Sequence, residues 1–178
     1  MSQLQVQSLC GQLDRRELTQ PQFVEACSRL ISASIGCGRA GIWLVDEVGG
    51  ASVLRCLGLY DRAKNRMTMA PNESGEWVGS YMNALRTTGH VLADDAMLHP
   101  ATAGLFADKL GERGVRSLLA SAFSLNGELF GAFTCTQLGE TCHWTSAQLA
   151  LLKRIGARVS LALAGASATS SLTLPMAL

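Results

Sequence analysis

The sequence has almost no net charge, few charged residues and no long uninterrupted apolar run. Its 15 lysines and arginines nearly balance its 14 aspartates and glutamates, so no strong field draws the chain to nucleic acid or anionic lipid. Charged residues make up 16% of the chain, against about 25% in an average soluble domain. The longest apolar stretch, residues 149–168, is interrupted by Lys153, Arg154 and Arg158, which are costly in a bilayer. We expect a cytoplasmic protein that binds neither nucleic acid nor membrane, and that covers part of its apolar surface in an oligomer.

The sequence also lacks the common signatures of catalysis and metal binding. It contains no H-E-x-x-H, no P-loop lysine and no nucleophile elbow, and its three histidines have no neighbouring ligand at metal spacing. Its cysteines form no C-x-x-C pair, and most lie in apolar patterns, where cysteine acts as a small hydrophobic residue. They are Cys10, Cys27, Cys37, Cys56, Cys135 and Cys142. We expect reduced core cysteines, no metal site and no enzyme.

Two further motifs favour structural roles. Residues 36–41 spell G-x-G-x-x-G, but a helix precedes them and a strand follows, the reverse of a dinucleotide-binding loop. We interpret Gly36 as the end of a helix. Asp94 and Asp95 suggest a paired-carboxylate or magnesium site, yet acidic residues after a short strand are more often caps of turns, which is the interpretation we favour.

What the sequence does contain is two hairpins. Asn126-Gly127 separates two apolar runs, and this dipeptide supplies the positive φ that a two-residue type I′ turn requires. The flanking segments must therefore pair antiparallel. Residues 46–50 make a second turn between two apolar runs, and a helix-rich middle separates the hairpins. An α+β fold with an antiparallel sheet and helical cover follows.

Capping boxes predict where two helices begin. Thr19 with Gln22 opens a helix that Gly36 ends, and Thr145 with Gln148 opens the last helix. A shorter helix covers about residues 6–14. In the middle segment, residues 76–86 and 101–112 have helical patterns, with a strand-like Val91-Leu92 between them. In the last helix, Leu152, Ile155, Val159 and Ala162 recur at three and four residues, which predicts a seam with another helix.

Several local patterns stand in an order that resembles the GAF domain family, the sensing and dimerisation module of bacterial signalling proteins. They are Ile42-Trp43-Leu44, residues 57–62, residues 91–96 with Pro100 and Thr102, residues 114–117, residues 127–131, and Trp144-Thr145 with Gln148. The resemblance covers about residues 39–163 and is greatest to GAF modules found with histidine kinases and diguanylate cyclases.

The resemblance implies a profilin-like sheet of about six strands. It places the terminal helices on one face, where they dimerise, and a helical ligand-pocket cover on the other. We divide the chain into an N-terminal helical extension (1–18), the GAF domain (19–167) and a flexible tail (168–178). No cysteine lies between Cys56 and Cys135, which argues against the covalent tetrapyrrole of some relatives and against methionine sulfoxide reductases. The cyclic-nucleotide signature is absent, and His99 is the one plausible haem ligand.

The candidate ligand-binding residues are three pairs. Trp77 and Tyr81 lie four apart and can present aromatic walls, or simply pack on the sheet. Asp95 and His99, also four apart, can offer an acceptor and a switchable donor. Ser117 and Ser121 share one strand face in an apolar run, where a ligand or a backbone carbonyl can satisfy each hydroxyl.

The expected function is a sensory module that binds an unidentified small molecule. It forms a homodimer through its terminal helices and controls a histidine kinase or diguanylate cyclase type of effector, in cis or in trans. No cofactor is identified. The alternative is a ligand-free GAF scaffold that serves only dimerisation, and a GAF-fold enzyme such as a methionine sulfoxide reductase comes third.

Overall fold

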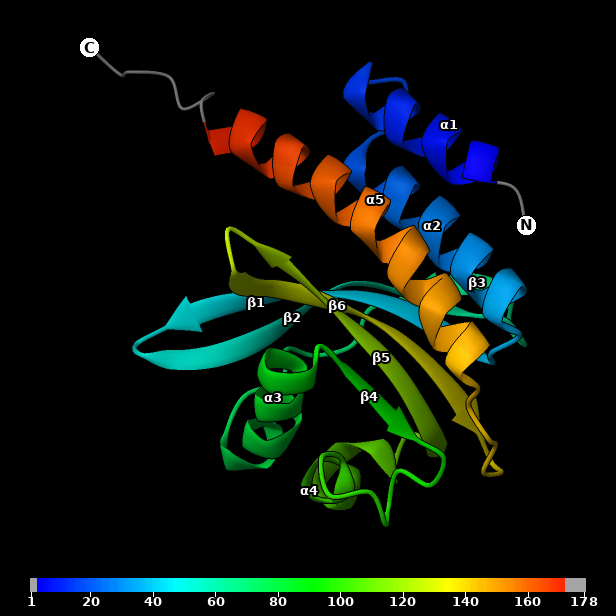
Figure 1. The fold of residues 1–178 in the computed structure, drawn as a ribbon, viewed down its shortest axis with the longest axis vertical. Helices are drawn as coiled ribbons and strands as arrows, with labels where there is room; N and C mark the ends of the chain where they lie inside the picture. Colours follow the sequence, from blue (N-terminus) through cyan, green and yellow to red (C-terminus); the bar gives the residue numbers. More distant parts are fainter. Residues whose placement is uncertain (1–2, 172–178) are drawn as a thin grey trace.

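A six-stranded antiparallel sheet separates two layers of helices in the computed structural model (Figure 1). The structure describes residues 3–171, apart from the side chains of residues 3, 76–77, 108, 125 and 166–171. The strands are β1 (Arg39–Val48), β2 (Ala51–Asp61), β3 (Arg66–Thr68), β4 (His90–Ala93), β5 (Val115–Leu125) and β6 (Glu128–Leu138). They lie in the order β3-β2-β1-β6-β5-β4. The helices are α1 (Gln3–Asp14), α2 (Gln20–Ile35), α3 (Glu76–Thr88), α4 (Ala103–Leu105) and α5 (Ser146–Ser171), with a π-helical turn η1 (Phe106–Leu110).

Both predicted hairpins are confirmed. Leu125 pairs with Glu128 across the β5–β6 turn, and Asn126 and Gly127 have φ values of 53° and 84°, as a type I′ turn requires. The β1–β2 turn uses Gly49 and Gly50, also at positive φ. The two hairpins join through β1 and β6, which pair antiparallel from Arg39–Thr136 to Leu44–Gly131. This pairing joins the hairpins into one antiparallel sheet, as the predicted α+β fold class requires.

The helices α1, α2 and α5 cover one face of the sheet (Figure 1). The predicted capping box at Thr19 is present, and Gly36 ends α2 in the left-handed conformation, which confirms the structural interpretation of the G-x-G-x-x-G spelling. At α5, the Thr145 hydroxyl accepts from the Gln148 N–H and the Gln148 side chain accepts from the Thr145 N–H. A Cβ on Gly156 would lie 2.9 Å from the Phe133 ring, so glycine lets α5 approach the sheet closely.

The predicted seam of α5 belongs to the core of the single chain. Leu152, Ile155, Val159 and Ala162 are all buried, at 0–8% exposure, against the sheet and the other two terminal helices. Their periodicity was correctly associated with helix packing, but the partners are α1, α2 and the sheet. These four residues are therefore not available to a second copy, and their assignment to a dimer interface is corrected.

The predicted domain boundaries divide a continuous helical layer. Val6 and Leu13 of α1 are buried in the same core as α2 and α5, so α1 packs as part of the domain. The helix α5 continues to Ser171, which includes the first residues of the predicted tail, and residues 172–178 lie outside the described part. Among residues 3–171, no helix combines the length and apolar character needed to cross a bilayer.

The other face of the sheet is covered by α3, α4 and η1 (Figure 1). The predicted helix over residues 76–86 is confirmed and extends to Thr88. The predicted helix over 101–112 is replaced by three residues of α4 and a five-residue π-helical turn. Thr102 explains the late start, because its hydroxyl donates to the Ala96 carbonyl at 2.8 Å and holds the preceding turn. The cover is therefore built of short, irregular pieces.

Candidate functional site

A cavity of about 60 Å³ lies between the cover and the sheet. Strands β1, β2, β5 and β6 form its floor, and α3, α4, η1 and the segment before α3 form its walls. Most lining side chains are apolar, among them Trp43, Leu54, Leu59, Leu105, Leu110 and Leu118. The sheet positions follow from the alternation of a strand, since Leu118 and Ala120 face the cover while Leu119 faces the terminal helices.

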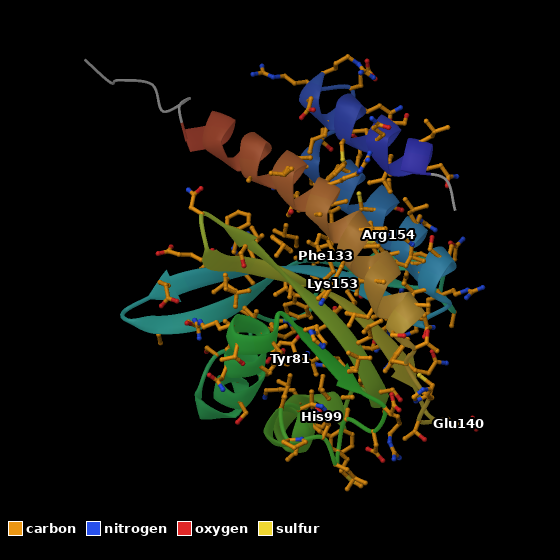
Figure 2. The ribbon with its side chains drawn as sticks, in the orientation of Figure 1. Tyr81, His99, Phe133, Glu140, Lys153 and Arg154 are labelled. Atoms are coloured by element: carbon orange, nitrogen blue, oxygen red, sulfur yellow. The ribbon has the colours of Figure 1, made fainter. Side chains whose placement is uncertain are left out.

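Tyr81 gives this apolar cavity an unusual polar group. The residue lies on α3, lines the cavity and is 2% exposed, and Figure 2 shows it between α3 and the sheet. Its hydroxyl is buried and has no hydrogen-bond partner among the described residues. Burial raises the pKa of Tyr81 well above its ordinary value, so the hydroxyl stays protonated and can donate. A buried hydroxyl without a partner costs free energy, which a bound acceptor would recover.

Charged side chains at the cavity are paired within the chain. The Arg39 Nε lies 2.8 Å from Asp61 Oδ2, and Arg39 also donates to the Arg113 carbonyl at 3.3 Å. The Arg113 Nη2 lies 2.6 Å from Glu73 Oε1, a close charge contact whose angle is not that of a hydrogen bond. Burial acts to raise the pKa of Asp61, but its hydrogen bonds with Arg39 and the Lys64 N–H hold that pKa below its ordinary value.

The Glu73–Arg113 contact also joins two parts of the cover. Glu73 precedes α3 and pairs its backbone with Leu54 of β2, whereas Arg113 lies between η1 and β5. Both residues line the cavity. Arg39, Glu73 and Arg113 were not predicted, because each lies in a loop or at a strand end and no local sequence pattern links them. The cavity was expected, but these charged walls depend on tertiary contacts.

Ser117 and Ser121 lie on the opposite face of the sheet from the cavity. They share that face with Leu119, which packs under the terminal helices, and Ser121 stands opposite Phe133 in the same layer. The Ser117 hydroxyl donates to the Asp94 carbonyl at 2.6 Å, so the backbone alternative accounts for it. The prediction that these serines face the ligand is wrong. The segment is a strand, as predicted, but the two serines point to the face covered by the terminal helices.

Asp95 and His99 shape the loop between β4 and α4 and do not line the cavity. The Asp95 side chain accepts from the Met97 N–H at 2.9 Å and lies 3.5 Å from Arg116. The His99 Nδ1 accepts from the Ala101 N–H at 3.2 Å, and Figure 2 shows His99 beside α4, apart from Tyr81. The structure therefore places neither residue where it can meet a ligand in this cavity, and His99 is not positioned as a haem ligand there.

Trp77 lies on α3, four residues before Tyr81, but its side chain is outside the described residues. Of the six predicted ligand-binding residues, Tyr81 is therefore the one whose described side chain lines the cavity. Helical spacing correctly placed Tyr81 on the inward face of the cover. Its binding role remains a prediction.

Asp94 connects the cover side of the sheet to the start of α5. Its side chain accepts from the Trp144 N–H at 2.9 Å and lies 2.6 Å from His143 Nδ1. The Trp144 N–H lowers the pKa of Asp94, burial opposes this, and His143 lowers it further. Ser117 bridges the same two segments, since it donates to the Asp94 carbonyl and accepts from the Cys142 N–H. The turn-capping interpretation is thus confirmed for Asp95, whose side chain accepts from the Met97 N–H, whereas Asp94 holds the segment that precedes α5.

Two wider hollows lie elsewhere. One, of about 690 Å³, lies where the two hairpins separate and includes Val45, Arg86 and Phe130. The other, of about 300 Å³, lies between α1 and α5 beside Arg158 and Leu161. Neither contains a buried polar group without a partner among the described side chains. Within the described residues, no group of three His, Cys, Asp or Glu side chains is arranged to hold a metal ion.

Comparison with solved structures supports the fold. A far-red-absorbing protein in its dark state with bound biliverdin IXa is 14% identical, with a TM-score of 0.71 over 91% of this chain and 98% of that one. The phycocyanobilin-bound GAF domain of a cyanobacterial phytochrome is 15% identical, with a TM-score of 0.69 over 90% and 94%. A GAF domain from a Coxiella burnetii phosphoenolpyruvate-protein phosphotransferase is 18% identical, with a TM-score of 0.60 over 96% and 98%.

At sequence identities of 14–18%, these structures show that the fold is shared and do not by themselves indicate a shared function. No curated protein matches the chain. The family model described as the GAF domain matches residues 21–163, which include α2, the whole sheet, the cover and most of α5. The matched span begins at residue 21, earlier than the resemblance seen in the sequence patterns, which began at about residue 39. The chain belongs to the GAF domain family.

Proposed function

We propose that this domain is a sensory module of bacterial signal transduction that binds a small molecule between the cover and the sheet. The observation that carries the proposal is the unpartnered Tyr81 hydroxyl, buried at an apolar cavity. Buried hydroxyls almost always have partners, so an orphan at a cavity is well explained by a ligand. Two structural neighbours hold a bound bilin, and one of them is a GAF domain, which supports ligand binding by this fold without indicating the same ligand.

The Asp94 contacts support a route from the ligand to the terminal helices. A ligand that prefers one arrangement of the cover shifts the population of that arrangement, by no more than its differential affinity. The strand β4 ends at the cover, and Asp94 directly after it holds the Trp144 N–H at the start of α5. A change in the cover can therefore alter how α5 begins. We assign α5 as the element that reports ligand binding to a histidine kinase or diguanylate cyclase type of effector.

We propose a cytoplasmic homodimer that uses the outward surface of the terminal helices. Leu161 on α5 is 69% exposed and lies beside the hollow between α1 and α5. Because the inward residues of α5 are occupied by the chain's own core, a dimer must use this outer side. Light scattering at micromolar concentration should give a dimer that Leu161→Glu weakens. A monomer in the unmodified protein would contradict the dimer.

A ligand screen tests the sensory role. Native mass spectrometry of the purified protein should detect a bound compound, or a thermal-shift screen of metabolites should find one that raises the melting temperature. Leu110→Phe, which fills the cavity from η1, should abolish the shift while circular dichroism shows an intact fold. Failure to find a ligand by either method, or a shift that survives Leu110→Phe, would argue against this cavity as the sensor.

The small cavity favours a second candidate, a scaffold that only dimerises. About 60 Å³ is well below the 300–1,000 Å³ that ligand pockets usually have, so the closed cover does not enclose a drug-sized molecule. A dimer with no stabilising compound would support the scaffold.

We regard an enzyme as the third candidate. Cys37 and Cys135 lie under the terminal helices, away from the cavity, which does not support a reductase site there.

A further inference from the structure

We propose that the ligand of the cavity is a compact, neutral and mainly apolar molecule that carries one hydrogen-bond acceptor for Tyr81. This inference rests on the proposed function, because it names the class of ligand for the same cavity. It follows from three properties of the walls: their charges are paired, the buried Tyr81 hydroxyl has no partner among the described residues, and most of the remaining surface is apolar and small.

The charged groups argue for a neutral ligand. Arg39 is paired with Asp61 and Arg113 with Glu73, so the four formal charges sum to zero. Asp61 and Glu73 are nearly completely buried. A charged ligand would have to separate one of these pairs and leave a buried carboxylate without its arginine, which is costly. A neutral ligand leaves both pairs intact.

Tyr81 argues for a single acceptor. Among the described cavity-lining side chains, two have a buried polar atom without a hydrogen bond, Tyr81 and Glu73. Glu73 already has the charge of Arg113 at 2.6 Å. The hydroxyl of Thr134 accepts from the Trp43 indole N–H at 3.0 Å. Of the neutral polar groups on the described walls, which also include the Thr136 hydroxyl, the Tyr81 hydroxyl is therefore the one that is completely buried without a partner, and a ligand would have to satisfy it.

The remaining walls and the volume argue for a compact apolar body that moves the cover. A cavity of about 150 Å³ holds benzene, so the present cavity of about 60 Å³ must expand before a ring can enter. The sheet floor is tied by its ladder hydrogen bonds, whereas Leu105 and Leu110 project from the short α4 and η1. Expansion should displace the latter, which couples ligand volume to cover movement.

Four isosteric probes separate the contributions. Acetophenone is neutral with a carbonyl acceptor, α-methylstyrene replaces the oxygen by CH₂, benzoate is an anion and benzamidinium is a cation. Dissociation constants would be measured by NMR titration, with the Trp43 indole signal reporting the cavity. The variant is Tyr81→Phe. The chain's other tyrosine supplies a matched control, since Tyr60 hydrogen-bonds Asn65 away from this cavity.

We expect acetophenone to bind at least tenfold more tightly than benzoate or benzamidinium. Tyr81→Phe should weaken acetophenone binding about five- to tenfold and leave α-methylstyrene within about twofold, while Tyr60→Phe changes neither. Tighter binding of a charged probe at Trp43 would overturn the ligand class and leave the sensory role standing. Equal losses for both neutral probes in Tyr81→Phe would overturn the acceptor. A Trp43 signal that responds to none of the four would remove the cavity itself as a small-molecule site.

Discussion

The two faces of the sheet are built in different ways. On the face of the terminal helices, α2 and α5 begin at capping boxes, and large side chains such as Phe23, Ile31 and Leu152 are completely buried. On the cover face, α3 begins at Gly75 without a side-chain cap, α4 has three residues, and η1 is a π-helical turn. The cavity and the unpaired Tyr81 hydroxyl lie on this second face.

Under the proposed function, the difference separates a stable face from a ligand-binding face. Helices with strong end signals and a dense core hold one face rigid. Short elements with few terminal hydrogen bonds have low local stability, which suits segments that must move for a ligand. Matched substitutions on the two faces test this difference in stability.

The largest expected effect comes from truncating a core leucine on each face. Leu152→Ala should lower the free energy of unfolding by about 3–4 kcal/mol, because the residue is completely buried in the helical layer. Leu110→Ala should cost about 2 kcal/mol, since it already borders the cavity. Urea unfolding of both variants measures the difference. Equal costs would show that the cover is packed as firmly as the helical layer.

A charged side chain at either of two buried α5 positions should unfold the chain. Leu152→Lys or Val159→Glu would place an unpaired charge in the core, so neither variant can test a dimer interface.

The next effect concerns the buried ion pair beside the cavity. Asp61→Asn should destabilise the fold by about 2–3 kcal/mol at pH 7, because Arg39 loses its partner but retains some contact with water. Asp61 has a lowered pKa, so its contribution is present above the unfolded pKa of about 4 and is lost as the pH falls through the folded value. The gap between the variant and the unmodified protein should shrink below pH 4.

Asp46→Asn is the matched control for that experiment. Asp46 pairs with Arg55 at 2.5 Å, but both side chains are about two-fifths exposed, so the cost should stay below about 1 kcal/mol. A larger loss for Asp46→Asn than for Asp61→Asn would contradict the importance assigned to the buried pair.

A smaller effect tests the capping difference. Thr19→Ala removes the side-chain acceptor of the Gln22 N–H and should cost about 1 kcal/mol in thermal or urea unfolding. Thr19→Ser keeps an oxygen in place and should cost less. If both variants match the unmodified protein, the cap does not contribute to the stability of the helical face.

Adding a methyl group at a helical glycine should have opposite signs on the two faces. Gly79 in α3 has open space where a Cβ would be added, so Gly79→Ala should stabilise the cover helix by about 0.5–1 kcal/mol. Gly156 in α5 faces the Phe133 ring at 2.9 Å, so Gly156→Ala should destabilise by about 1 kcal/mol or more through overpacking. Hydrogen exchange of α3 in Gly79→Ala would show whether the cover becomes less mobile. A gain from Gly156→Ala would mean that α5 is not held tightly against the sheet.

Much of the fold was predictable because its signals are local. Asn126-Gly127 determined the turn, Thr19 and Thr145 with their glutamine partners marked helix starts, and Gly36 marked a helix end. Residues 101–112 were predicted as one regular helix, but the helical segment begins only at Ala103 and changes from α4 to the π-helical turn η1 at Phe106. The pattern of apolar residues is similar for a regular helix and for two short irregular turns.

The site was less predictable because it depends on which face of each element turns inward. Tyr81 was correctly placed at the cover, while Ser117 and Ser121 were assigned to a strand but to the wrong face. The seam residues of α5, such as Leu152 and Val159, have the same spacing whether the partner is another chain or the chain's own sheet. Burial in the single chain distinguishes the two cases.

The antiparallel sheet and the beginnings of its main helices follow from local sequence signals, because turns and caps depend on the φ preferences and hydrogen bonds of residues close together in the chain. The pairing of Arg39 with Asp61 and of Glu73 with Arg113, and the lack of a partner for the Tyr81 hydroxyl among the described residues, arise in the folded chain. Such contacts join residues distant in sequence, and their free energies depend on burial that no local pattern specifies.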